Sequence, residues 1–135
     1  MTVSSVVSEQ RGFFKVTITG VASTANAGIG SIANPEGVAL LIVRSFLYAR
    51  TGSTGAANLD IGTGVAATTK GTNILSTFDG IQATIGGKAF YCQAVSVNET
   101  EEAVTWPAAY YLNFTGSATT VGLDADLYVE YLRLA

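Results

Sequence analysis

Apolar and polar side chains alternate along several short stretches of this 135-residue chain. In residues 12–22, Phe14, Val16 and Ile18 occupy alternate positions, and polar side chains lie between them. Because successive side chains of a β-strand point to opposite faces, this period of two predicts a strand with one buried face. Similar stretches predict further strands at 59–61, 89–97, 104–106, 110–115 and 123–132.

The last of these strands should bury Leu127, Val129 and Tyr131 and expose the residues between them. Asp124 and Asp126 are therefore expected on a solvated outer face. They lack the spacing of oxygen ligands that a calcium-binding loop requires, so the sequence predicts no metal site there.

The longest apolar run, residues 38–50, follows the turn sequence Asn34-Pro35-Glu36-Gly37. An amphipathic helix is an alternative, but the β-branched residues and the glycines on either side favour a strand buried on both faces. Arg44 interrupts the run. A fully buried, unpaired guanidinium is too costly to persist, so we expect a carboxylate, several backbone carbonyls or a subunit interface around it.

The stretches between the predicted strands are rich in small and polar residues. Residues 23–37 and 62–73 are predicted loops, and 74–78 is compatible with one helical turn. About seven or eight short strands without a convincing long helix indicate an all-β sandwich or barrel. One β-sandwich domain is expected at 12–135, preceded by an N-terminal arm or edge strand at 1–11.

The charge content of the chain is low, at 13% of residues, against about 25% in typical soluble domains. A surface so poor in charge and rich in small residues is expected to be covered in an assembly, and we expect a homo-oligomer, specifically a trimer. The net charge of −3 and the scattered basic residues argue against binding to nucleic acid or an anionic membrane. No apolar stretch reaches the length of a membrane span.

Residues suited to catalysis are scarce. The chain contains no His, which excludes the usual triads and histidine-based zinc sites. Its one cysteine, Cys92, lies in a predicted strand and is expected to be a small buried hydrophobe. Glu99, Glu101 and Glu102 lie on a predicted turn rather than in a cleft. The sequence therefore predicts no enzymatic activity and no catalytic, cofactor-binding or metal-binding residues.

Trp106, Tyr110 and Tyr111 cluster around Pro107. Such aromatic residues can pack in the core, form a contact with a subunit or partner, or offer a platform for a sugar. The sequence leaves these three roles open.

Residues 34–80 and 120–132 resemble small capsid decoration, or cement, proteins of tailed bacteriophages. The likeness rests on an apolar strand with Arg44 at its centre, a Thr/Gly/Ala loop, "DIG" at 60–62, a "DG" turn at 79–80 and the final "LYVEY". The resemblance implies a jelly-roll-like β-sandwich on the outside of an icosahedral head, usually as a symmetric oligomer. It implies no enzymatic activity.

The functional hypothesis is a structural protein that is made in the host cytoplasm, binds the major capsid protein on the outer surface of the virion and stabilises the head. No cofactor is expected. An alternative is a glycan- or receptor-binding module of a head or tail fibre. Candidate interface residues are Val3, Val6, Val7, Arg44, Trp106, Tyr110 and Tyr111.

Overall fold

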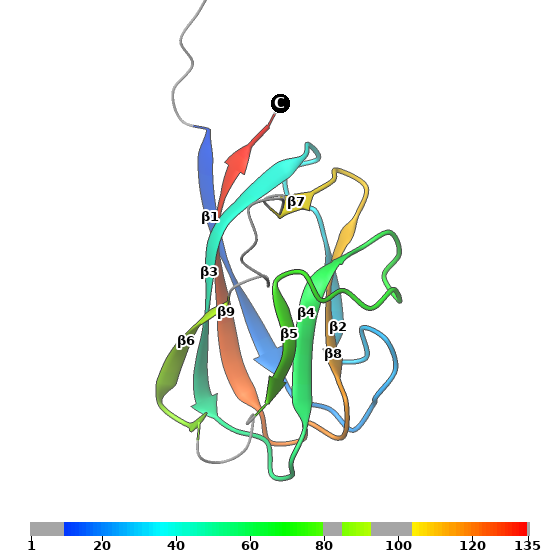
Figure 1. The fold of residues 1–135 in the computed structure, drawn as a ribbon, viewed down its shortest axis with the longest axis vertical. Coiled ribbons are helices and arrows are strands. Elements are labelled where there is room, and N and C mark those ends of the chain that lie inside the picture. The colour runs from blue at the N-terminus through cyan, green and yellow to red at the C-terminus, as the bar shows by residue number, and fades with distance from the viewer. Residues whose placement is uncertain (1–9, 80–84, 93–103, 135) are drawn as a thin grey trace, which may run out of the picture.

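A computed structural model describes residues 10–79, 85–92 and 104–134 of the chain (Figure 1). The described part contains nine strands in two antiparallel sheets and no α-helix, which confirms the predicted all-β sandwich with slightly more strands than expected. No described helix is long and apolar enough to cross a membrane. The strands are β1 (Arg11–Thr19), β2 (Gly30–Ala33), β3 (Leu40–Thr51), β4 (Asn58–Gly64), β5 (Leu75–Asp79), β6 (Lys88–Cys92), β7 (Thr105–Trp106), β8 (Tyr111–Gly116) and β9 (Asp124–Arg133).

The strand order is that of a jelly roll. The first sheet runs β1-β9-β3-β6, with β7 added on β3, and the second sheet runs β2-β8-β4-β5. Early strands thus pair with late ones in reverse order, β1 with β9, β2 with β8, β3 with β6 and β4 with β5. These four pairs together form one long antiparallel hairpin. When the hairpin folds over on itself, the β3–β9 and β4–β8 pairs form as well, which gives the two Greek keys of the jelly roll.

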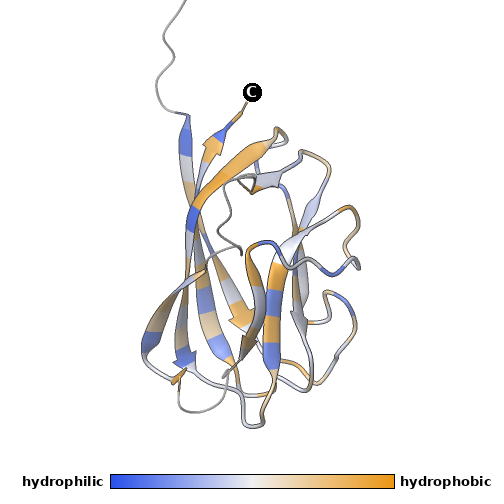
Figure 2. Cartoon of the chain, in the orientation of Figure 1, coloured by the Kyte–Doolittle hydropathy of each residue, from blue (hydrophilic) through white to orange (hydrophobic). Residues whose placement is uncertain are grey.

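The core lies between the two sheets, which Figure 1 shows face to face. Ile18 of β1 and Leu127, Val129 and Tyr131 of β9 are buried, as the alternation predicted. Figure 2 shows the corresponding bands of apolar and polar residues along β4 and β9. Other large side chains that are fully buried are Leu40, Leu47, Leu59, Ile61, Trp106, Leu112 and Leu123.

Strand β3 confirms the choice of strand over helix for the apolar run, but burial on both faces was wrong. The register of β3 against β9 shifts at Val43, which forms a β-bulge. Leu40 before the bulge and Leu47 after it are both fully buried, whereas Val43 and Tyr48 are exposed. Since a bulge inserts one extra residue, it changes which positions face the core, and the uninterrupted apolar run concealed this change.

Two strands lie where the sequence predicted otherwise. Strand β2 falls inside the predicted loop 23–37, and β5 occupies the stretch that was compatible with a helical turn. Neither strand has an alternating pattern of its own. Their pairing with β8 and β4 makes them strands, because tertiary context readily overrides weak β-propensity.

The predicted turn before β3 is held by the side chain of Asn34. Its Oδ1 accepts hydrogen bonds from the backbone N–H groups of Glu36 (2.9 Å) and Gly37 (3.1 Å). Its Nδ2 donates to the carbonyls of Val38 (2.9 Å) and Trp106 (3.1 Å). One amide thus forms the turn and connects it to β7.

Candidate functional site: the aromatic face of the first sheet

Five aromatic side chains gather on the outer face of the first sheet. They are Phe13, Phe46, Tyr48, Tyr91 and Tyr128, and we call this surface the aromatic face. The register places Tyr128, Phe46 and Tyr91 in one row across β9, β3 and β6. Phe13 is 61% exposed and Tyr91 is 72% exposed. An antiparallel sheet facing water normally carries polar residues there, so this face is suited to binding.

The rings of the aromatic face are held by their neighbours. The centroids of Phe46 and Tyr91 are 4.7 Å apart with planes inclined by 46°, and those of Phe13 and Tyr128 are 6.2 Å apart with planes inclined by 36°. The guanidinium of Arg44 lies 5.7 Å from the centroid of Phe46. Side chains fixed in this way lose little conformational entropy when a partner binds.

Arg44 has the carboxylate partner that the sequence analysis expected. Its Nε lies 3.0 Å from Oε1 of Glu130, and the more distant Arg11 lies 3.8 Å from the same carboxylate. The Arg44 side chain is 58% exposed rather than buried. The ion pair therefore lies on the surface, within the aromatic face.

Arg50 joins the two aspartates of β9 at the other end of this face. Its Nε donates to Oδ2 of Asp124 (3.0 Å), its Nη1 donates to Asp126, and the Thr17 hydroxyl donates to Oδ1 of Asp126 (2.9 Å). The hydrogen bonds from Arg50 lower the pKa of both carboxyl groups. Only 5% of the Asp126 side chain is exposed, so the expectation of a solvated Asp126 was wrong. The sequence could not reveal that Arg50 covers it.

The predicted aromatic cluster does not form an exposed platform. Trp106 is completely buried, its indole N–H donates to the carbonyl of Tyr110 (2.9 Å), and its ring meets Phe14 edge-on at 6.0 Å. Tyr110 and Tyr111 are half-buried. Of the three roles considered, core packing describes Trp106. Val3, Val6 and Val7, the other interface candidates, lie outside the described residues.

Cys92 is buried, as expected, at the inner side of β6. Burial raises the pKa of its thiol to about 11, although a hydrogen bond from Ser45 acts in the opposite direction. At neutral pH the thiol is protonated, and only the thiolate is a good nucleophile. The described residues also contain no group of three or more potential metal-ligating side chains.

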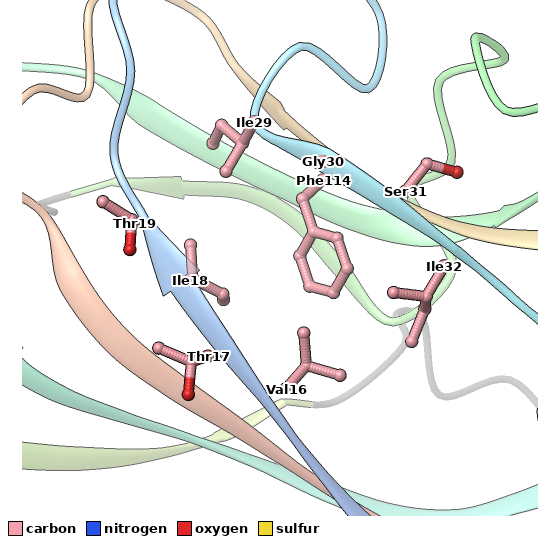
Figure 3. A pocket seen from close by; sticks show the side chains of 9 residues that line it. All are labelled: Val16, Thr17, Ile18, Thr19, Ile29, Gly30, Ser31, Ile32 and Phe114. Carbon is pink, nitrogen blue, oxygen red and sulfur yellow. The ribbon is translucent and has the colours of Figure 1, made fainter.

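A small hollow opens between the edge strands of the two sheets. Its volume is about 150 Å³, and Figure 3 shows side chains of β1 and of the facing sheet pointing toward it. Between the other two edge strands, β5 and β6, Phe78 and Phe90 meet edge-on with ring centroids 5.0 Å apart. The hollow is suited to an aliphatic side chain, because the residues that line it are uncharged: Val16, Thr17, Ile18, Thr19, Ile29, Gly30, Ser31, Ile32 and Phe114.

No protein-family model matches the sequence, and no curated protein matches it. The structure is similar to a chain in the structure described as "Capsid of Ralstonia phage GP4", with a TM-score of 0.56 and 14% sequence identity. The match covers 100% of this chain and 92% of that chain. The two chains therefore share a fold over nearly their whole lengths.

The aromatic face was missed at the level of sequence, although its members occupy predicted strands. The alternation around Leu127 and Val129 already placed Tyr128 outward. What could not be known was the register that brings Tyr128, Phe46 and Tyr91 into one row, because strand pairing in a jelly roll joins residues far apart in sequence.

Proposed function

We propose that this chain is a non-enzymatic structural protein of a phage virion, of the decoration or cement type, that binds the outside of the head and stabilises the capsid. The observation that carries the proposal is the structural similarity, over the entire chain, to a chain of comparable length in a phage capsid. The jelly-roll strand order supports it, since viral capsid domains are among the proteins that use this architecture.

The stabilising effect would follow from mass action. A ligand that binds the assembled shell but not its dissociated subunits stabilises the shell by about 2.7 kcal/mol per site at a free concentration 100 times its dissociation constant. Such a ligand benefits from being rigid, because little entropy is then lost on binding. The continuous core and the cross-strand ion pairs of this sandwich are consistent with that requirement.

The proposal that the protein is not an enzyme rests on its acids as well as on the lack of His. Asp60, Asp126 and Glu130, which have little exposed surface, each pair with a Lys or Arg side chain. Each of these carboxylates is thus engaged with a cation of the protein itself, and the hydrogen bonds from Arg50 lower the pKa of Asp126, which makes Asp126 a poor general acid at neutral pH. Hydrolysis by two converging acids is therefore disfavoured at these positions.

We propose that the major capsid protein is the partner and that the decoration protein itself is a homo-oligomer, specifically a trimer. Closed symmetry is the usual state of soluble homo-oligomers, and a trimer would contact several capsomers at once. Sedimentation velocity at micromolar concentration tests the oligomer. A monomer at all concentrations, both free and after release from heads, would contradict it.

The number of copies per virion tests the function. Quantitative mass spectrometry of purified particles should find hundreds of copies of the 13.9 kDa chain, and particles that lack it should release their DNA at a lower temperature. Its absence from virions would refute the proposal. A handful of copies in the tail, with binding on a glycan array, would instead favour the fibre module, for which the exposed Tyr91 and Phe13 provide the candidate contacts.

A further inference from the structure

We infer that the aromatic face is the surface by which this protein docks onto the capsid shell, and that the shell presents carboxylates and apolar side chains to it. The inference rests on the proposed function and adds to it the surface and the chemistry of the contact.

The amino-acid composition of the aromatic face is typical of a protein interface. Tyr, Phe and Arg are enriched at protein interfaces, and the residues that dominate binding energy are commonly Tyr, Trp and Arg. The aromatic face combines five aromatic rings with the guanidinium of Arg44. The rings are tilted against one another, so they form no continuous flat platform for a sugar. This contour favours a protein surface as the occupant.

The charged side chains of the aromatic face differ in how far they are exposed to solvent. Four cations, Arg11, Lys15, Arg44 and Arg50, and three carboxylates, Asp124, Asp126 and Glu130, belong to this face. Arg11 and Arg44 are 73% and 58% exposed, whereas the Glu130 carboxylate that they share is 15% exposed. A partner that approaches the Arg44 end of the face therefore meets cations first, whereas at the other end the Asp124 side chain (46% exposed) is more exposed than that of Arg50 (37% exposed). The surface complementary to the Arg44 end is acidic, although the protein as a whole has a net charge of −3.

The aromatic face is smaller than a standard stable interface. The strands β1, β9, β3 and β6 have 9, 10, 12 and 5 residues, so spacings of about 4.8 Å between strands and about 3.4 Å per residue give the face an area on the order of 600 Å². This is roughly three-quarters of the ~800 Å² that each partner contributes to a standard stable interface. One face alone is thus expected to bind weakly. Several linked copies would bind much more tightly, because avidity can raise affinity by about 10²–10⁴-fold.

Paired substitutions test the docking surface on heads that lack the native protein. We expect Phe13→Ser combined with Tyr91→Ser to reduce the apparent affinity for heads at least tenfold. The matched control is Val65→Ser, which removes an equally exposed apolar side chain (64% exposed) outside the first sheet and should bind normally. Both variants should keep the wild-type circular dichroism spectrum, because the substituted side chains are exposed.

The charge argument is tested at Lys15. Lys15→Glu should weaken binding to heads at least fivefold, and Lys15→Arg should restore it. A zero-length carbodiimide cross-linker should join Lys15 to Asp or Glu of the shell protein, whereas Lys70, which pairs with Asp60, should give no link to the shell.

The outcomes separate the docking surface from the function. If the wild-type protein binds heads and the Phe13/Tyr91 variant binds equally well, the inference is wrong and the proposed function stands. If those substitutions abolish self-association in solution and leave the binding of monomer to heads unchanged, the face is a subunit interface, which also overturns the inference. If the wild-type protein does not bind heads at all, both proposals fail.

Discussion

Two glycine-to-alanine substitutions should change stability in opposite directions. Gly30 lies in β2 beside the hollow between the sheets, and a Cβ atom added there would meet nothing within 4 Å. Gly62 lies in β4 where the following loop crosses it, and a Cβ atom there would approach the backbone N of Thr72 to 2.4 Å and the backbone C of Gly71 to 2.5 Å. Neither glycine has a positive φ angle, so local space, rather than backbone strain, decides the result.

The magnitudes follow from these surroundings. Gly30→Ala should raise the free energy of unfolding by about 0.4–1 kcal/mol, because alanine restricts the unfolded chain and its methyl group enters the hollow. Gly62→Ala should lower it by about 3 kcal/mol, at the upper end of overpacking costs, because backbone atoms must shift. That shift would disturb Asn73, whose side chain accepts from Thr63 N–H (2.8 Å) and donates to the Thr63 hydroxyl (2.8 Å).

Urea denaturation of both variants at one fixed protein concentration is the assay. With a slope of about 2 kcal/mol/M, the midpoint should rise by about 0.3 M for Gly30→Ala and fall by about 1.5 M for Gly62→Ala. Equal shifts in one direction would refute the reasoning, because they would show that glycine itself, and not the space around it, sets the effect.

Three further predictions concern charge and attachment. Arg50 lowers the folded-state pKa of Asp126, so this pair stabilises the fold above about pH 4, the usual pKa of an unfolded aspartate. The stabilisation is lost as the pH falls through the folded-state pKa. Arg50→Gln should therefore make the melting temperature, measured by thermal shift, depend less steeply on pH in the acid range. Arg44→Met should change the free energy of unfolding by less than about 1 kcal/mol, since the Arg44 side chain is 58% exposed and Arg11 also pairs with Glu130, and a larger loss in urea denaturation would contradict this. Deleting residues 1–10 should reduce occupancy on heads if that segment pairs with a partner's strand edge, and undiminished occupancy measured by gel densitometry would show that it is dispensable.

The sequence was sufficient to predict the fold class and much of the core. Period-two alternation correctly placed Phe14, Val16 and Ile18 toward the interior, because in β1 the signal comes from each residue and its immediate neighbours. It failed for β2, whose Gly-Ser-Ile-Ala sequence has no marked strand preference and which is a strand because it pairs with β8. The local pattern of residues predicts strands such as β1, whereas a strand such as β2 depends on pairing with residues far away in the sequence.

The candidate site was predictable only in its parts. Arg44 was recognised as a residue that needs a carboxylate, yet nothing in the sequence singled out Glu130, which lies 86 positions later, as its partner. For Trp106, which Pro107 and two tyrosines follow, the sequence left core packing, a partner contact and a sugar platform open, and its position in β7 places it against Phe14 inside the sandwich. Aromatic residues are common in both cores and interfaces, so their type alone does not separate the two.

The bulge at Val43 connects the fold to the proposed docking surface. Shifting a strand by one residue moves every side chain beyond that point to the opposite face. Without the extra residue, the half of β3 after the bulge would turn Arg44, Phe46 and Tyr48 toward the core and Leu47 toward water. With it, Leu47 is buried, and the guanidinium and the two rings lie on the outer face beside Glu130 and Tyr128. One inserted residue therefore lets both halves of β3 bury a leucine while the second half presents Arg44, Phe46 and Tyr48 on the aromatic face.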